Sequence, residues 1–222
     1  MKALTTTRRV SGTRSVQARA AAQVLKDGGI VALPTDTLYG LAALATDEAA
    51  VRRIFVAKGR PQGMALPVLL AGTRQLDTYA ADVPDVARKL AAKFWPGQLT
   101  LVVRKASNIP DAVTGGAGTV ALRVPDSELV RDIVQRLGAP ITGTSANRSG
   151  RPGLTTAEAV VKELDGLVDL VLDYGAGEQP GGQASTIVDV TGTPLRVLRE
   201  GPVPLSEIEE CCGEEVVLAD GK

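Results

Sequence analysis

The chain has 222 residues, 44% of them hydrophobic and 23% charged, which is typical of one globular domain with a sizeable core. Its 25 basic and 25 acidic side chains leave no net charge, which excludes strong long-range attraction to nucleic acid or anionic membranes. The chain has no histidine, which removes the commonest general base and the usual Ser/His and Cys/His nucleophile pairs.

Apolar spacing, capping residues and glycine stops predict the helices, and short apolar runs predict the strands. In chain order, the predicted helices are 15–26, 47–57, 85–94, 126–137, 156–164 and a short one at 206–212. The predicted strands are 30–33, 66–70, 99–103, 119–124, 139–144, 170–174, 186–190 and 195–199. This alternation, with consecutive strands late in the chain, indicates an α/β fold with one open, twisted sheet of mixed parallel and antiparallel strands and flanking helices.

We expect one domain over residues 15–202 and a short tail at 203–222, whose polar end is predicted to be disordered. The N-terminus lacks the apolar core of a signal peptide, and no segment reaches the roughly 18 apolar residues of a membrane helix. These features predict a cytoplasmic protein. The two cysteines, Cys211 and Cys212, are adjacent, which suits neither a disulfide framework nor a zinc site with CxxC spacing.

The segment PTDTLYGL follows the predicted strand at 30–33 directly. Its Thr35, Asp36 and Thr37 therefore lie where open α/β sheets usually bind ligands, at the carboxyl end of a strand. The alternative is a turn in which these side chains bond the local backbone, and the segment alone does not decide between the two.

Lys58 and Arg60 are separated by one glycine at the end of a predicted helix. A lysine point charge beside an arginine fork suits a polyphosphate. In isolation, a favourable interaction of the two cations with the helix C-terminal dipole explains the pair as well.

The segment TGTSANRSG follows another predicted strand and includes Gly143, Ser145 and Asn147. Its hydroxyls, amide and glycine backbone suit a phosphate or a carboxylate, and a turn before the next helix is the alternative. The segment resembles a nucleophile elbow but lacks its second glycine, and a hydrolase triad is excluded without histidine.

Arg123 is flanked by apolar residues within the predicted strand 119–124, so it requires either a ligand or a buried carboxylate such as Asp189. Two further candidates are Ser185, at the start of a strand, and Arg199, at the end of one. No Walker A pattern is present in the sequence.

Taken in order, PTDTLYGL, KGRP, FWPGQLT, ALRVPD, TSANRSG, STIVD and REG closely resemble the YrdC-like family over about residues 15–202. The resemblance implies a twisted α/β sheet with a positively charged concave face. It also implies L-threonylcarbamoyladenylate synthase activity, a nucleotidyl transfer in which L-threonine, bicarbonate and ATP give threonylcarbamoyl-AMP and pyrophosphate. Partner transferase proteins would then pass the threonylcarbamoyl group to an adenosine of tRNA.

The resemblance assigns two sets of residues. The nucleotide set is Lys58, Arg60, Thr119, Ser145, Asn147 and Arg199. Within it, Lys58 and Arg60 would hold the ATP phosphates and are the expected catalytic groups. The set for L-threonine and bicarbonate is Thr35, Thr37, Arg123, Gly143 and Ser185. Mg²⁺ would accompany the ATP phosphates, and no protein ligand for it is predicted.

The segment Met64–Leu69 departs from the family pattern, which often has Pro-Leu and a histidine there, so contacts from this stretch are in doubt. The chain also lacks the long C-terminal domain of some relatives, which predicts a minimal synthase. Two rival functions are a non-catalytic module that binds structured RNA and a carbamoyl transferase that forms a carbamoyl adenylate. The neutral charge and 3% aromatic content disfavour the first, and the absence of further upstream domains disfavours the second.

Overall fold

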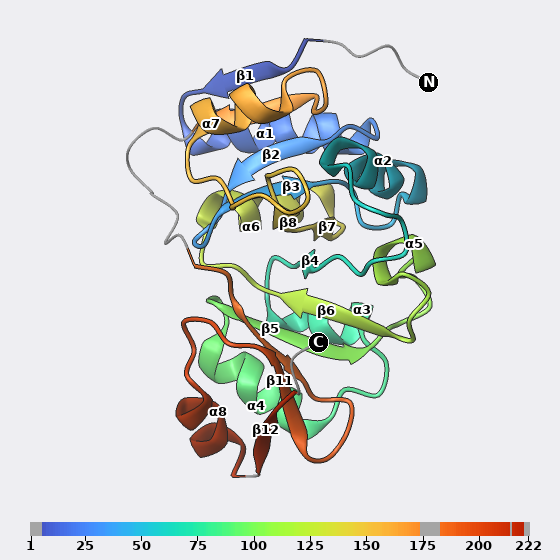
Figure 1. Ribbon diagram of the computed structural model, residues 1–222, viewed down its shortest axis with the longest axis vertical. Coiled ribbons are helices and arrows are strands. Elements are labelled where there is room, and N and C mark those ends of the chain that lie inside the picture. Colours follow the sequence, from blue (N-terminus) through green and yellow to red (C-terminus); the bar gives the residue numbers. More distant parts are fainter. Residues whose placement is uncertain (1–5, 174–182, 214, 220–222) are drawn as a thin grey trace.

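A computed structural model describes residues 6–173, 183–213 and 215–219 of the chain. It contains two open mixed sheets, one above the other in Figure 1, with helices packed around them. The α/β class and the mixture of parallel and antiparallel strands are confirmed. The sequence did not indicate that the strands divide between two sheets, and the predicted strand 139–144 is itself divided at Gly143, with one part in each sheet.

The upper sheet has five strands in the order β1-β9-β2-β3-β8. Its outer pair, β1 and β9, is parallel, and β3 is antiparallel to both of its neighbours. The bounds of its strands are β1 Arg8–Ser11, β9 Leu170–Asp173, β2 Val31–Pro34, β3 Tyr39–Ala42 and β8 Thr144–Ser145.

The lower sheet has seven strands in the order β12-β11-β10-β5-β6-β4-β7. In its centre, β10 pairs parallel with β5, and β5 pairs antiparallel with β6. The bounds of its strands are β12 Val216–Leu218, β11 Leu195–Arg199, β10 Thr186–Asp189, β5 Leu99–Arg104, β6 Thr119–Arg123, β4 Val68–Leu69 and β7 Ile141–Thr142.

Four of the helices, α1, α2, α6 and α7, begin behind a residue whose side chain accepts a hydrogen bond from the backbone of the first turn. The helix after β3 begins behind Asp47, whose carboxylate accepts from Ala50 N at 3.1 Å, and it ends at Gly59 with a left-handed φ of 60°. The helices are α1 Arg14–Lys26, α2 Glu48–Lys58, α3 Leu76–Tyr79, α4 Asp85–Phe94, α5 Asp111–Thr114, α6 Glu128–Leu137, α7 Ala157–Leu164 and α8 Leu205–Cys212, with one 3-10 turn, η1 Thr73–Gln75.

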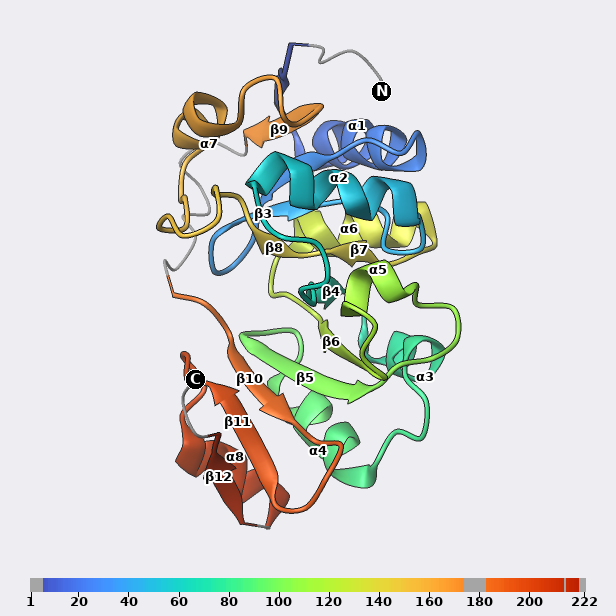
Figure 2. The ribbon, with the colours of Figure 1, turned by 45° about the vertical axis from the view of Figure 1, so that its right-hand side comes forward.

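One hydrophobic core joins the two sheets. It includes Leu41 of β3, Ile54 of α2, Leu101 of β5 and Leu122 of β6, all of which are fully buried. A second core lies on the other face of the upper sheet, under α1 and α6. Figure 2 shows the ends of the upper strands facing the ends of the lower strands. Since the first core contains residues of both sheets, its packing fixes the position of one sheet relative to the other.

The segment after residue 202, predicted as a tail with a short helix and a disordered polar end, packs on and extends the lower sheet. Helix α8 packs on α4 and buries Ile208, and β12 pairs parallel with β11 and buries Val216. The expected disorder is therefore wrong for Val216–Leu218. The predicted strand end at Tyr174 and the last residues, 220–222, lie outside the described residues, and the domain division at residue 202 stays a prediction.

Across the part of the chain that the structure describes, no helix combines the length and the apolar character that a bilayer crossing requires.

Candidate functional site

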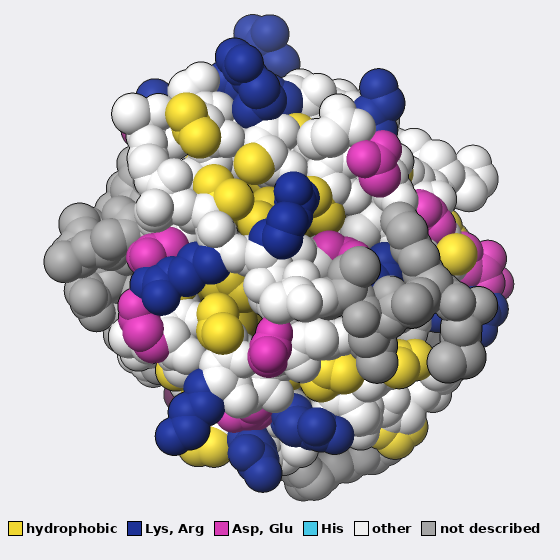
Figure 3. Space-filling view, turned by 90° about the horizontal axis from the view of Figure 1, so that it is seen from above, with side chains coloured by type: hydrophobic (Ala, Val, Ile, Leu, Met, Phe, Trp, Pro, Cys, Tyr) yellow, Lys and Arg dark blue, Asp and Glu magenta, His cyan; other side chains and the backbone are white. Residues whose placement is uncertain are grey.

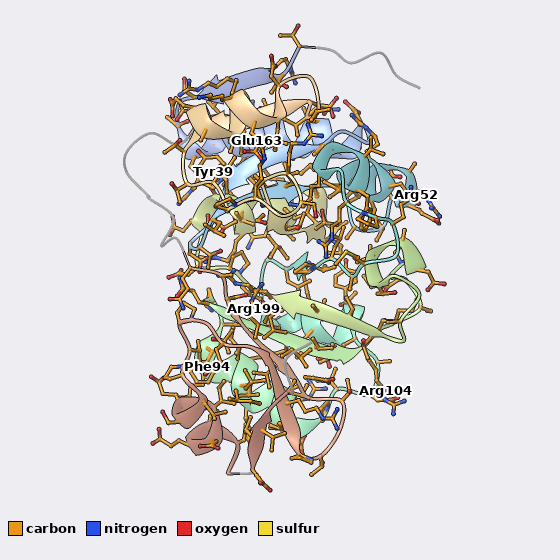
Figure 4. All side chains as sticks on the ribbon, in the orientation of Figure 1. Tyr39, Arg52, Phe94, Arg104, Glu163 and Arg199 are labelled. Atoms are coloured by element: carbon orange, nitrogen blue, oxygen red, sulfur yellow. The ribbon has the colours of Figure 1, made fainter. Side chains whose placement is uncertain are left out.

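A cavity of about 330 Å³ lies where the two sheets meet. Its upper wall is the turn between β2 and β3 together with β8, and its lower wall is formed by residues of β5, β6, β10 and β11. The loop that follows α2 closes one side with Arg60. Figure 4 shows Arg199 at the end of the lower sheet that faces the upper one.

The turn between β2 and β3 is held by its own threonines. Thr35 Oγ1 donates to Leu38 O at 2.7 Å and accepts from Thr37 N at 3.1 Å. Thr35 Oγ1 also lies 2.9 Å from Thr37 Oγ1. The local hydrogen bonds of the turn interpretation are therefore present, and because Thr35 and Thr37 also line the cavity, their role in ligand binding stays a prediction.

Arg123 reaches the cavity from the end of β6 and forms an ion pair with Asp36, with 2.6 Å between Nη2 and Oδ2. Its Nε donates to Gly97 O at 2.8 Å, and its Nη1 donates to Thr37 Oγ1 at 3.3 Å. A guanidinium has five N–H donors, so two remain for a ligand once these three described acceptors are served. Burial lowers the pKa of Arg123, and the charge of Asp36 opposes that shift.

The alternative for Arg123, a buried carboxylate partner, is present in the structure, but the partner is Asp36 and not Asp189, the example that the sequence offered. Asp189 lies on β10, where its Oδ1 accepts from Thr191 N at 2.9 Å and from Thr191 Oγ1 at 2.6 Å. Asp36 takes its place from the upper sheet, so the ion pair links the two sheets across the cavity.

Ser185 and Arg199 form a second polar group on the lower wall. Arg199 Nε donates to Ser185 O at 2.9 Å, and Arg199 Nη2 donates to Ser185 Oγ at 3.2 Å. Thr100 Oγ1 lies 2.8 Å from the same Ser185 Oγ. Burial and the positive charge of Arg123 both lower the pKa of Arg199.

Gly143 lies at the point where the chain passes from β7 of the lower sheet to β8 of the upper sheet. A Cβ atom at this position would lie 2.5 Å from Leu69 Cγ, which is closer than carbon atoms approach. Glycine therefore lets the backbone pass between Leu69 and the cavity. Both residues line the cavity wall.

Lys58 is buried beneath the loop that follows β8. Its Nζ donates to the carbonyl oxygens of Ser145 and Asn147, the second at 2.8 Å, and lies 3.4 Å from Asn147 Oδ1. Burial, helped by the charge of Arg60 and opposed by that of Glu163, lowers the pKa of Lys58 to about 8. In this arrangement Lys58 holds the loop in place.

Arg60 presents its guanidinium to the cavity from the loop after α2. Its Nε donates to Met64 Sδ at 3.1 Å, and burial lowers its pKa. Within the described residues, neither Arg60 nor Arg199 forms an ion pair with a carboxylate, whereas Arg123 does. The cavity therefore holds two cations whose charge no carboxylate of the described residues compensates by an ion pair.

Eight of the eleven residues predicted from the sequence line this one cavity: Thr35, Thr37, Arg60, Arg123, Gly143, Ser145, Ser185 and Arg199. Lys58 and Asn147 lie behind its wall. Thr119 begins β6 four residues before Arg123, roughly 13 Å away along the strand. It pairs with Arg104, which Figure 4 places at the outer end of β5, far from Arg199.

The sequence interpretation did not assign a role to Thr100 or to the apolar wall formed by Ala65, Pro67, Leu69 and Ile187. The position of Thr100 within FWPGQLT was an available signal, because this segment is part of the family pattern. Ala65, Pro67 and Leu69 belong to the segment where the sequence departs from that pattern, so the pattern offered no signal for them, whereas Ile187 lies within the STIVD segment of the pattern.

The fold and the cavity define an α/β protein in which the facing ends of two sheets present hydroxyls and cations to one cavity. A protein-family model, Sua5_yciO_yrdC, described as "Telomere recombination", matches residues 23–201. The chain belongs to this family.

Two curated relatives and one solved structure illustrate the similarity. A threonylcarbamoyl-AMP synthase of Pyrococcus abyssi is 43% identical over 196 residues, which are 88% of this chain and 57% of the relative. One of Pseudomonas aeruginosa is 37% identical over 183 residues, which are 82% of this chain and 97% of the relative. The crystal structure of P. abyssi Sua5 complexed with L-threonine superposes with a TM-score of 0.88 and 40% identity, covering 96% of this chain and 62% of that one.

This chain therefore spans just over half the length of the Pyrococcus relative and nearly the whole length of the Pseudomonas one.

Proposed function

We propose that this chain is a threonylcarbamoyl-AMP synthase that condenses L-threonine, bicarbonate and ATP. The observation that carries the proposal is the cavity between the sheets, where hydroxyls meet two cations without an ion-pair partner among the described residues. Relatives named threonylcarbamoyl-AMP synthase, and a similar structure complexed with L-threonine, support the same activity.

The proposed reaction needs positioning and charge neutralisation more than a protein nucleophile. The threonine nitrogen forms a bond to the carbon of bicarbonate and water leaves, which gives a carbamate and releases one proton. A carbamate oxygen then attacks the α-phosphorus of ATP and breaks its bond to the bridging oxygen, so that pyrophosphate leaves. A cavity that supplies arginines and hydroxyls, without any histidine, is suited to this chemistry.

The cations have distinct proposed tasks. Arg60 and Arg199 neutralise the phosphates as charge develops on the leaving pyrophosphate. Arg123, with two donors left, binds the carboxylate of the amino acid. The phosphate role predicted for Lys58 requires its ammonium to exchange the carbonyls of Ser145 and Asn147 for phosphate oxygens.

Magnesium enters the proposal as a companion of ATP. Among the described residues, no three His, Cys, Asp or Glu side chains gather into a metal-binding group. Its ligands would then be phosphate oxygens and water, as is usual for nucleotide-bound Mg²⁺. The product is a reactive mixed anhydride, so a transferase that modifies a tRNA adenosine is the proposed consumer.

The test is pyrophosphate release by the purified chain, with L-threonine and bicarbonate supplied together, singly or not at all. Mass spectrometry of the same mixtures detects the threonylcarbamoyl adenylate. We expect release only when both substrates and ATP are present. Release that does not depend on threonine, or the absence of the adenylate, would contradict the proposal, and carbamoyl phosphate and duplex RNA would then be the ligands to test.

Figure 3 bears on the RNA-binding rival for one face of the molecule. Seen from above, Lys and Arg side chains lie among Asp and Glu side chains and do not gather into one basic patch. Binding to a phosphate backbone usually depends on such a patch. This face therefore gives the RNA-binding rival no support.

A further inference from the structure

The loop that carries Arg60 touches the end of a short helix from a different part of the chain. Residues 59–67, here called the Arg60 loop, join α2 to β4, and helix α5 is capped by Gly115. A Cβ atom on Gly115 would overlap the carbonyl oxygen of Gly63 and lie 2.7 Å from its carbonyl carbon. Position 115 must therefore be glycine for the Arg60 loop to follow its present path.

Hydrogen bonds hold the Arg60 loop on both sides of this contact. Near its start, Arg60 N donates to Phe55 O of α2 at 2.9 Å, and near its end Leu66 N donates to Val113 O of α5 at 2.8 Å. Figures 1 and 2 show α5 beside the chain that leads from α2 to β4. The contact of Gly63 with α5 lies between these two hydrogen bonds and fixes the middle of the loop.

The same contact lies next to the residue that holds the Arg60 side chain. Met64 follows Gly63, and its Sδ accepts from Arg60 Nε at 3.1 Å. A thioether sulfur is a weak, uncharged acceptor, so it orients the guanidinium and leaves its charge in place. A shift of Gly63 would move Met64, and with it the guanidinium that lines the cavity.

Of the two sides of the contact, α5 is the firmer one. Ile109, just before α5, and Val113 within it are 1% and 0% exposed and belong to the core that joins the two sheets. Residues 61–65 of the loop are all exposed. A side chain at position 115 would therefore displace the loop, by on the order of 1 Å before ordinary carbon contacts are restored.

We propose that Gly115 is a positioning residue for the reaction. Through Gly63 and Met64 it sets the place of the Arg60 guanidinium in the cavity, although Gly115 itself is not part of the cavity wall. The catalytic part of this inference rests on the proposed function, and the structural part does not. A misplacement of about 1 Å in a group that stabilises the transition state costs up to about a hundredfold in rate.

Gly115→Ala tests the proposal, and Gly138→Ala is its matched control. Each glycine caps the end of a helix, α5 or α6, with a left-handed φ of 65°, so both substitutions introduce the same kind of backbone strain. A Cβ atom on Gly138 meets no heavy atom of the described residues within 4 Å. The difference between the two variants therefore isolates the overlap with Gly63.

Amide hydrogen exchange followed by mass spectrometry tests the structural part without any need for activity. We expect peptides that cover residues 59–66 to exchange about threefold to tenfold faster in Gly115→Ala, the effect of weakening one backbone hydrogen bond. In Gly138→Ala these peptides should exchange as in the wild type. Exchange in this loop that is equal in all three proteins would overturn the proposal.

The rate of pyrophosphate release tests the catalytic part. We expect kcat to fall by about tenfold to a hundredfold in Gly115→Ala and to stay within about twofold of the wild type in Gly138→Ala. In an Arg60→Ala background, Gly115→Ala should lower kcat no further, because the group that it positions is gone. General loosening of the protein would instead give the same further loss in both backgrounds, and that result would overturn the proposal.

Met64→Ala keeps the test decisive should Gly115→Ala fail to fold. Met64 is 47% exposed, so its truncation leaves the core intact while it removes the acceptor of Arg60 Nε. We expect kcat to fall by about threefold to tenfold in this variant, and again by nothing further when Arg60 is already alanine. An unchanged kcat would overturn the relay through Met64.

A wild type that forms no adenylate would contradict the proposed function. The exchange measurement alone would then uphold or overturn the placement of the Arg60 loop by Gly115.

Discussion

Arg60 is the residue in which the sequence interpretation and the geometry agree most directly. It was predicted from the KGRP segment, and it presents a guanidinium to the cavity with no ion-pair partner in the described chain. We expect Arg60→Ala to lower the rate of pyrophosphate release by about a hundredfold to a thousandfold, because charge stabilisation in the transition state is lost.

The control for this prediction is Arg88→Ala. Arg88 is exposed and pairs with Asp77 on the surface, so the same change of charge occurs far from the cavity. Steady-state assays of both proteins, with urea unfolding to compare their stability, provide the check. Equal rates in Arg60→Ala and the wild type would remove Arg60 from the site.

Lys58 gives a prediction about pH. Burial lowers its pKa in the folded chain to about 8, against an ordinary value of 10.5. Between these values the unfolded chain binds a proton that the folded chain has lost, so the free energy of unfolding should rise with pH across this window. Below pH 8 the cost of burying the charged amine is fully present.

Urea unfolding of wild type and Lys58→Met at pH 7, 8, 9 and 10 measures this contribution as the difference between the two curves. The rise that belongs to Lys58 should be missing in the variant, which removes the titrating group. Parallel curves for the two proteins would contradict the assignment. We also expect Lys58→Met to loosen the loop at Ser145 and Asn147, because their carbonyls lose a donor.

The ion pair between Arg123 and Asp36 is buried, with side chains 6% and 12% exposed. Asp36→Asn should lower the free energy of unfolding by about 3 kcal/mol, because a buried guanidinium is left without its counter-charge. The double variant Asp36→Leu, Arg123→Met should recover most of that loss and remain inactive with threonine. Urea unfolding of the wild type, Asp36→Asn and the double variant measures these free energies. An unchanged free energy of unfolding in Asp36→Asn would show that the ion pair contributes little to stability.

At the residue scale, most of the site was predictable because strand ends, glycines and cations form short continuous patterns in the chain. Eight of the assigned residues gather in one cavity for this reason. The partner of Arg123 was not predictable, since Asp36 and Asp189 are both carboxylates next to strands. Only the pairing of strands in space shows which of them faces the guanidinium.

At the scale of elements, the passage of the chain from β7 to β8 shapes the cavity. We expect Gly143→Ala to destabilise the protein by about 1–3 kcal/mol, because the added methyl group would overlap Leu69. In a Leu69→Ala background the same change should cost much less. A double-mutant cycle measured by urea unfolding gives the coupling energy, and simple additivity would contradict the proposed contact.

The long elements were predictable from apolar period and caps, and the short strands were not. Helices α1, α2 and α4 lie close to the ranges predicted for them. Strand β3, Tyr39–Ala42, lies outside the predicted strands, because a short run that contains glycine carries little strand signal. The division into two sheets was missed because strand pairing between distant segments leaves no periodic pattern in the sequence.

At the scale of the whole molecule, the last segment is part of the lower sheet. A chain ended at residue 204 would lose the cover of α4 and β11 that Ile208, Cys212 and Val216 provide. We expect its melting temperature to fall by on the order of 10 °C, since burying each such side chain contributes about 1.5–3 kcal/mol. Scanning calorimetry compares the melting temperature of this shortened chain with that of a chain ended at residue 219. Equal melting temperatures would support a domain that is complete at residue 202.

Two arginines of the cavity have no ion-pair partner in the part of the chain that the structure describes, and the total charge of the chain is zero. Their field is screened beyond a Debye length of about 8 Å at physiological ionic strength, so it acts on a nucleotide only at the mouth of the cavity. Diffusional encounter with ATP should therefore proceed at an unsteered rate, and added salt should shorten the lifetime of the complex more than it slows its formation. The affinity for ATP would then depend on how slowly the bound nucleotide dissociates.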